Sequence, residues 1–321
     1  MNNLAVEVKN FSKRYGSITA VDRISFNVYR GEIFGLLGPN GAGKTTTLEC
    51  LEGLRRADGG TLKVMGVDPA REQRRLLALI GVQLQTGSLP GYIRVGEAMR
   101  LFSAYHGVEP DYALLKRLGL EEQLNVQYHA LSTGQKRRLA LALAMVHRPA
   151  VLFLDEPTAG LDVSTRIALH ELMAELRAEG TTILLSTHDL AEAESLSDRV
   201  AILLAGKLVA VGTPRELTSA GEGLTKVSVC TSGNSLAGLS LPGVVHKAEQ
   251  DQYDVFFTAS PGPTVAELIS RIDSAGDELI DLRVERPSLE ERFMELTGKQ
   301  VMKRDENNGQ AWKVRNDQLM L

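Results

Sequence analysis

A glycine-rich segment begins at residue 38 and reads Gly-Pro-Asn-Gly-Ala-Gly-Lys-Thr, which fits the spacing G-x-x-x-x-G-K-[ST]. The apolar run 33–37 before it predicts a β-strand, and the residues from 43 to about 54 predict an α-helix. In this setting the glycines let the backbone fold back with its amides pointing inward, and the helix N-terminus completes a concave site for phosphate oxygens. The sequence therefore predicts an α/β fold with a nucleotide site at the start of this helix.

The polar side chains of this loop have separate predicted roles. Lys44 is expected to reach the β- and γ-phosphates, and the hydroxyl of Thr45 is expected to ligate Mg²⁺. The residues predicted to bind ATP at the loop are Gly38, Pro39, Asn40, Gly41, Ala42, Gly43, Lys44, Thr45 and Thr46.

Two adjacent carboxylates, Asp155 and Glu156, follow the apolar run 151–154. In open α/β sheets, ligands bind outside the carboxyl ends of the strands. Asp155 is therefore expected to hold the magnesium shell, and Glu156, on the other side of the chain, to orient or deprotonate an attacking water. An apolar run followed by two acids is more often a strand end with solvated carboxylates. The upstream phosphate loop is what favours the functional interpretation.

His188 ends a second apolar run, predicted as a strand over 182–186. A histidine in such a place is usually an ordinary surface or core residue. This strand is expected to neighbour the Asp155 strand, however, which would bring His188 within reach of the γ-phosphate. Spacing alone leaves both interpretations open.

The pattern along the chain predicts its organisation. Strand and helix patterns alternate past Val211, which favours a mainly parallel core sheet. The stretch from about 86 to 128 lacks a strong strand and carries helical patterns at 95–105 and 113–118. We therefore expect a nucleotide-binding domain over 1–218 with a helical subdomain at about 86–148. A small α+β domain over 219–300 and a polar, flexible tail over 301–321 should follow.

Composition excludes several classes of protein. Basic and acidic residues number 36 and 40, are interspersed, and give a net charge of −4. A dedicated nucleic-acid binder would have a basic excess on one face, so no nucleic acid is expected as a partner. The chain lacks the roughly 18–20 uninterrupted apolar residues of a membrane-spanning helix, and its N-terminus is not of the secretory type. Cys50 and Cys230 fit no metal or disulfide spacing and are expected to be incidental thiols.

The order of these motifs, from about residue 4 to residue 217, resembles that of the ABC transporter ATPases. Residues 131–135, Leu-Ser-Thr-Gly-Gln, are similar to the family's signature LSGGQ and precede a basic, apolar helix and then the acid pair. The resemblance implies that Tyr15 stacks on adenine and that His188 is the switch histidine. It also implies that Gln85 contacts Mg²⁺ and senses the membrane partner, and that 159–162, with Asp162, is the loop after the acid pair.

Several positions depart from the family pattern or leave alternatives open. Thr133 replaces the more common glycine at the third signature position. Leu84 stands where a proline often precedes the glutamine, and Gln83 is a second candidate for the role of Gln85. We prefer Gln85 because the helical segment starts just after it. Tyr15 also fits an ordinary aromatic residue at a strand end.

The resemblance further implies that the chain acts as a pair. Gln135 is expected to open a helix after a glycine, which would make the signature a second anion-binding helix start. In the family, each ATP is clamped between the phosphate loop of one chain and the signature of the other, and closure drives a subunit motion. The residues expected to bind a partner's ATP are Ser132, Thr133, Gly134, Gln135 and Asp162.

The C-terminal segment 284–298, VERPSLEERFMELTG, is similar to the closing motif of ATPase subunits of ABC-2-type exporters, including the drug-resistance class. The resemblance implies a homodimer, or a pair with another ATPase subunit, at the cytoplasmic face of the membrane. Its hydrolysis of ATP would drive a separately encoded integral-membrane permease that exports a drug-like or other small compound. The ATPase of an importer and a soluble, non-transport ABC ATPase are the alternatives, and the sequence does not encode the transported compound.

Overall fold

The computed structural model describes residues 3–84, 87–219, 224–233, 235–236, 241–250 and 252–296. The predictions for Gln85 and for the tail over 301–321 lie outside these residues. The chain divides into two compact units, Met1–Pro214 and Arg215–Leu321, and each is described by itself.

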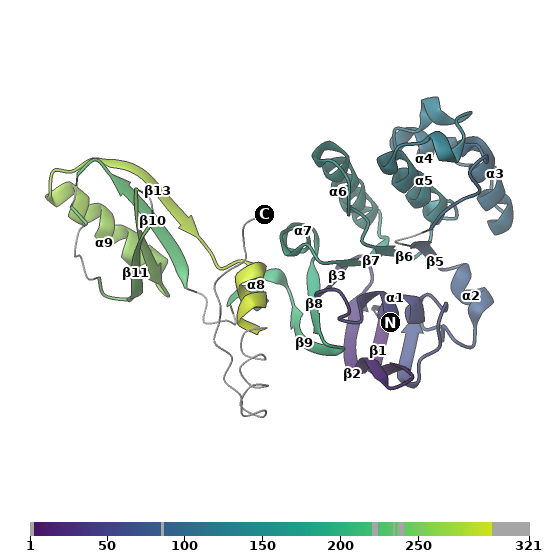
Figure 1. Ribbon diagram of the computed structural model, residues 1–321, viewed down its shortest axis with the longest axis horizontal. Helices are drawn as coiled ribbons and strands as arrows, with labels where there is room; N and C mark the ends of the chain where they lie inside the picture. The colour runs from purple at the N-terminus through teal and green to yellow at the C-terminus, as the bar shows by residue number, and fades with distance from the viewer. Residues whose placement is uncertain are drawn as a thin grey trace. The chain divides into compact units, whose positions relative to one another are not determined.

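Two sheets form the framework of the first unit within the described residues (Figure 1). A six-stranded sheet has the order β5-β6-β7-β3-β8-β9, and its strands pair in parallel except for the antiparallel pair of β8 and β9. A three-stranded antiparallel sheet has the order β2-β1-β4. The strands are β1 (Leu4–Tyr15), β2 (Ile18–Tyr29), β3 (Ile33–Leu37), β4 (Gly59–Val64), β5 (Ile80–Gln83), β6 (Val151–Asp155), β7 (Thr182–Thr187), β8 (Arg199–Leu204) and β9 (Lys207–Gly212).

Helices cover the six-stranded sheet, and α3, α4 and α5 gather beside β5 at one edge (Figure 1). The helices of this unit are α1 (Lys44–Leu51), α2 (Gln73–Leu77), α3 (Val95–His106), α4 (Tyr112–Arg117), α5 (Thr133–Met145), α6 (Val163–Ala178) and α7 (Leu190–Leu196), with short 3₁₀ turns at Glu121–Gln123 and Tyr128–Ala130. Helix α8 (Pro214–Ser219) begins at the boundary between the two units. The helical patterns predicted at 95–105 and 113–118 correspond to α3 and α4. The helix predicted over 43–54 is shorter than expected and ends at Leu51.

Strand β6 shows why its sequence is apolar throughout. Val151 and Phe153 join the core on the face covered by α1, whereas Leu152 and Leu154 join the core formed with α5 and α6. A parallel strand covered on both faces needs apolar side chains at every position, rather than at alternate ones. The predicted parallel core sheet is therefore confirmed, with β9 as an antiparallel edge.

The antiparallel sheet was not foreseen from the sequence. Strand β1 runs from Leu4 to Tyr15, and its pairing with β2 shifts register at several points. One of these irregularities spans Asn10, whose φ of 47° is in the left-handed region. Such bulges interrupt the alternation of apolar and polar residues by which a strand is recognised in sequence.

The second unit has its own core. Within the described residues, β10 (Thr225–Thr231), β11 (Val244–Gln250), β12 (Tyr253–Thr258) and β13 (Leu279–Glu285) form an antiparallel sheet of order β11-β12-β10-β13. The amphipathic helix α9 (Pro261–Ser274) packs on it through Leu268 and Ile272, against Val227, Val229 and Phe256. Residues 289–296 are helical. This is the predicted small α+β arrangement.

No helix in the described part of the chain combines the length and the hydropathy that a bilayer crossing requires.

Candidate nucleotide site

The phosphate loop connects β3 to α1, and two of its glycines are fixed by the backbone around them. Gly38 has a φ of 152°, and a Cβ there would lie 2.3 Å from the carbonyl oxygen of Leu203. Gly43, the N-cap of α1, has a φ of 101°, and its Cβ would lie 2.7 Å from the carbonyl oxygen of Ala20. Both positions therefore require glycine. The loop bends back over the start of α1 between β8 and β2.

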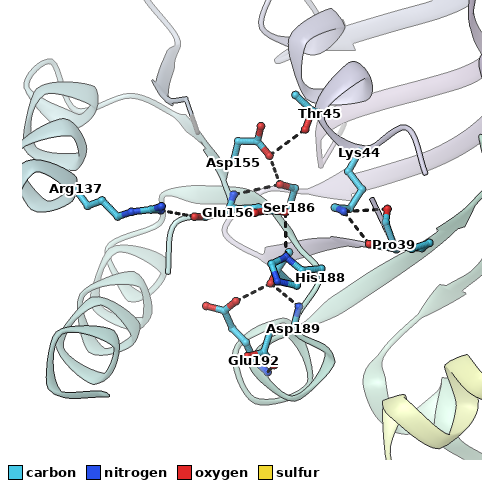
Figure 2. Close-up of polar contacts among 12 residues, drawn as sticks. Pro39, Lys44, Thr45, Arg137, Asp155, Glu156, Ser186, His188, Asp189 and Glu192 are labelled. Carbon is cyan, nitrogen blue, oxygen red and sulfur yellow. Dashed lines mark hydrogen bonds and ion pairs between the residues drawn. The ribbon is translucent and has the colours of Figure 1, made fainter. Parts of the chain in front are cut away.

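Lys44 folds back over the loop it follows. Its ammonium donates to the carbonyl oxygen of Gly38 at 2.7 Å and to that of Pro39 at 3.3 Å (Figure 2). The side chain is buried, and burial lowers the pKa of Lys44 below its ordinary value of 10.5, while the charges of Glu156 and Asp155 oppose that shift. A cation is thus held at the mouth of the loop, where phosphate oxygens would replace the carbonyls as its acceptors.

Asp155 lies next to Thr45, at the carboxyl end of β6. The Thr45 hydroxyl lies 3.4 Å from Asp155 Oδ1, and the hydroxyl of Ser186 on β7 donates to the same oxygen (Figure 2). Hydroxyl and carboxylate oxygens are ligands that Mg²⁺ prefers. The predicted pair of Thr45 and Asp155 is therefore chemically suited to that ion.

Glu156 turns away from Asp155 and contacts His188. Its φ of 48° is in the left-handed region, which is strained for a non-glycine residue and bends the chain at the end of β6. Its Oε1 lies 3.1 Å from His188 Nδ1, and its amide donates to the carbonyl oxygen of Ser186 at 3.1 Å (Figure 2). The structure thus brings Glu156 and His188 together.

Two residues of this cluster were missed by the sequence analysis. Ser186 contacts both acids, because its hydroxyl donates to Asp155 and also lies 3.3 Å from the Glu156 amide nitrogen. Arg137 of α5 donates to the carbonyl oxygen of Glu156. Their positions in sequence offered a signal, since Ser186 lies two residues before His188 and Arg137 lies in the basic first turns after the signature. Their roles depend on how β6, β7 and α5 pack.

The signature segment starts α5 two residues earlier than predicted. Ser132 is the N-cap, its hydroxyl accepts from the amide of Gln135 at 3.2 Å, and its own amide donates to Gln135 Oε1 at 2.9 Å. Gln135 therefore lies within the first turn and does not open the helix. This capping box explains the spacing of Ser and Gln. A Cβ at Gly134 would lie 3.4 Å from the Thr165 methyl group, so the segment packs against the start of α6.

Asp162 is the N-cap of α6, and its carboxylate is engaged within its own chain. It accepts from the Thr165 amide at 3.0 Å, from the Thr165 hydroxyl at 2.7 Å and from the Ser164 hydroxyl at 2.6 Å. These hydrogen bonds, led by that from Ser164, hold the pKa of Asp162 well below its ordinary value. It is an anion that fixes the first turn of α6.

The remaining predicted residues lie around this cluster. Tyr15 is 39% exposed at the end of β1, with the cations of Lys13 and Arg55 each 5.5 Å from its ring centre. Gln83 ends β5 as a buried side chain whose Oε1 has no hydrogen-bond partner among the described residues. Gln85 lies outside the described residues.

A buried acid, Glu52, lies one residue past the end of α1. It is 2% exposed, and neither carboxylate oxygen has a hydrogen-bond partner in the described part of the chain. Burial raises the pKa of Glu52 to about 8, and the charges of Asp155 and Glu49 contribute to the rise. Folding therefore favours the protonated form of Glu52. The stabilisation that this protonation gives the folded protein is complete below the ordinary pKa of 4.5 and is lost as the pH rises through about 8.

The Glu52→Gln variant should therefore be less sensitive to alkali than the wild type. Between about pH 6 and pH 9, we expect wild-type unfolding free energy to fall by roughly 1–3 kcal/mol relative to the variant, since one pKa unit is worth about 1.4 kcal/mol. Chemical denaturation across this range measures the difference, with the exposed Glu171→Gln as the control. Parallel pH profiles for the wild type and Glu52→Gln would contradict a protonated Glu52.

The chain is similar in sequence to the ABC transporter family and to exporter ATP-binding proteins. Residues 21–159 match the model of the ABC transporter family. The chain is 37% identical to Nod factor export ATP-binding protein I of Ralstonia nicotianae, covering 92% of this chain and 94% of that protein. It is 35% identical to daunorubicin resistance ATP-binding protein DrrA3 of Streptomyces coeruleorubidus, covering 93% of this chain and 97% of that protein.

Solved structures give the same result for the first unit. An ATP-binding subunit of an ABC transporter is 32% identical with a TM-score of 0.62, covering 66% of this chain and 91% of that one. A dimeric bacterial ABC transporter cassette is 25% identical with a TM-score of 0.60, covering 65% of this chain and 98% of that one. The predicted fold class, a P-loop cassette with an inserted helical subdomain and a small C-terminal α+β domain, is confirmed. The chain belongs to the ATP-binding cassette (ABC) transporter family, as one of its ATP-hydrolysing subunits.

Proposed function

We propose that this chain is the ATPase subunit of an ABC-2-type exporter, which pairs with a second cassette and drives a separately encoded membrane permease. The observation that carries the proposal is the polar cluster beside the phosphate loop. In it, Thr45 lies next to Asp155, and Glu156 lies next to His188. A phosphate cradle facing a paired acid and histidine is an arrangement for cleaving a phosphate–oxygen bond with water.

In this proposal, each residue of the site has a separate role in ATP binding or hydrolysis. Backbone amides of the loop 38–46 and the Lys44 ammonium bind the phosphates, and the exposed ring of Tyr15 stacks on adenine. Glu156 orients or deprotonates the attacking water, and its bond to His188 keeps the carboxylate aimed. Magnesium, held by Thr45, Asp155 and the predicted Gln85, would supply positive charge against the phosphate oxygens.

Pairing completes the site in this proposal. Ser132 and Thr133 are exposed at the start of α5, where the first-turn amides that the capping box does not use suit a phosphate. We assign residues 132–135 and Asp162 to the ATP held by a partner cassette, which is a second copy or a paired ATPase subunit. The dimeric cassette among the similar structures supports this arrangement. Closure on ATP and reopening after hydrolysis would then move the attached permease.

Export is inferred from relatives that match both units of the chain. Their printed names describe Nod factor export and daunorubicin resistance, and the matches cover more than nine-tenths of this chain. We propose a cassette over 1–218 with its helical subdomain at about 86–148, a C-terminal domain over 219–300 and a tail over 301–321. The subunit would lie at the cytoplasmic face of the membrane through its permease, and the exported compound would be small.

Co-expression with a permease encoded beside this chain tests the proposal. We expect the chain to co-purify with that permease from detergent extracts. Inside-out vesicles containing both should accumulate the exported compound with ATP, and vesicles with Glu156→Gln should not. A chain that stays in the soluble fraction beside an expressed permease would contradict the exporter assignment, while its ATPase activity would be a separate result.

A further inference from the structure

A buried carboxylate lies directly behind the switch histidine. Glu192 of α7 is 4% exposed, and each of its carboxylate oxygens has one hydrogen-bond partner. Oε2 accepts from the Thr187 hydroxyl at 2.8 Å, and Oε1 lies 3.1 Å from His170 Nε2. Burying a carboxylate is unfavourable by several kcal/mol unless it is hydrogen-bonded. We therefore infer that the role of this acid is to hold its two hydrogen-bond partners in place, rather than to pack α7.

The first partner, Thr187, fixes the backbone on both sides of His188. Its hydroxyl donates to Glu192 and accepts from the amide of Asp189 at 3.0 Å. Asp189 in turn accepts from the Glu192 amide at 3.0 Å and so caps α7. Figure 2 shows Glu192 and Asp189 beside the turn that carries His188. The His188 side chain is 57% exposed, so the position of its ring depends on this turn and on its contact with Glu156.

The second partner, His170, belongs to α6. This helix begins at the Asp162 cap, and His170 lies on it about two turns later. A further contact joins the same elements, because the Arg166 guanidinium lies 3.9 Å from the carboxylate of Asp189. Helix α6 therefore contacts the residues that follow His188 at two points.

We propose that Glu192 is a positioning residue for His188, and that its bond to His170 couples His188 to α6 and so to Asp162. This inference rests on the proposed function, in which Asp162 faces the ATP of a partner cassette. Arrival of a partner at Asp162 would then be sensed at the His188 of the same chain. Glu192 touches no substrate in this account. It holds the switch histidine in the orientation that supports Glu156.

Steady-state ATPase kinetics of the full chain test the proposal. Glu192→Gln and Thr187→Val should lower kcat about 10-fold or more, because a misplaced catalytic group is strongly penalised, while KM for ATP stays within about twofold. Thr187→Ser keeps the hydroxyl and should restore most of the activity. Glu171→Gln, at an exposed acid of α6 beside His170, is the matched control and should behave as the wild type.

A pair of His170 variants tests the link to α6. His170→Gln keeps a side-chain N–H donor and should retain most of the activity, whereas His170→Phe should lose several-fold in kcat. The double variant His170→Phe/Glu192→Gln should be no slower than Glu192→Gln alone, because both changes break one network. Fully additive losses would overturn the coupling to α6.

Other outcomes separate this inference from the proposed function. Wild-type kcat in Glu192→Gln, or equal losses in Thr187→Ser and Thr187→Val, would overturn the positioning role. If Glu192→Gln does not fold, the near-isosteric Thr187→Val decides the question. An ATP-dependent dimer of Glu156→Gln that also forms with Glu192→Gln added supports a role in turnover rather than in pairing. Failure of Glu156→Gln to pair with ATP would instead contradict the proposed function.

Discussion

Replacing Glu156 with glutamine is expected to reduce ATP turnover at least about 100-fold while leaving ATP binding intact. The substitution keeps the shape of the side chain and removes the carboxylate that would orient or deprotonate water. Its amide can still meet His188 Nδ1, which lies 3.1 Å from Oε1 in the wild type. ATP binding should survive because the phosphate loop and Lys44 are unchanged.

Two measurements distinguish a specific loss of hydrolysis from a loss of folding or of ATP binding. Titration with a fluorescent ATP analogue should give a wild-type Kd, and phosphate release should be near background. Sedimentation with ATP should show a dimer that the wild type forms only transiently, because the bound nucleotide is no longer cleaved. The exposed Glu171→Gln should hydrolyse ATP normally. Turnover of Glu156→Gln at the wild-type rate would remove Glu156 from the mechanism.

The second large effect is expected at Gly38. A methyl group there would lie 2.3 Å from the backbone oxygen of Leu203, in a conformation with a φ of 152°. Because that oxygen belongs to β8, the loop itself must move. Overpacking and backbone strain together should lower the unfolding free energy of Gly38→Ala by roughly 2–4 kcal/mol and abolish nucleotide binding.

Gly41 offers a control in the same loop. Its φ of 79° is also in the left-handed region, but a Cβ there would meet no atom within 4 Å. Gly41→Ala should therefore lose only about 1 kcal/mol from backbone strain. Thermal unfolding and ATP titration of both variants measure the contrast. Equal stability losses would show that the close approach of Leu203 does not decide the requirement for glycine at position 38.

The sequence predicted the elements whose pattern is local. The phosphate loop, the runs that became β6 and β7, and the acid pair are contiguous, and their chemistry depends on a short spacing. Residues 132–135 also carried a local signal, although the capping box places the helix start at Thr133 rather than at Gln135. Family resemblance added the roles of Tyr15, Gln85 and Asp162, which remain predictions.

The features that the sequence did not predict depend on contacts between segments that are distant in the sequence. Ser186 joins the two acids only because β6 and β7 pair in parallel with Asp155 opposite Ser186. Glu192 and His170 lie 22 residues apart in sequence and meet only when α6 and α7 pack. The antiparallel pairing of β1 with β2 was not predicted, because its register shifts at several bulges and follows no local pattern. Tertiary packing, not propensity, decides each of these cases.

Binding of Mg-ATP to purified Lys44→Ala is the most direct test of the nucleotide site. The buried ammonium bonds to two loop carbonyls and is placed to exchange them for phosphate oxygens. Because a charge-assisted hydrogen bond contributes about 1.5–3 kcal/mol, calorimetric titration should show ATP affinity at least about 10-fold weaker than wild type. Replacing the exposed Lys116 by alanine should leave affinity unchanged. A wild-type protein that does not bind Mg-ATP, or a Lys44→Ala variant that binds it equally well, would contradict the account.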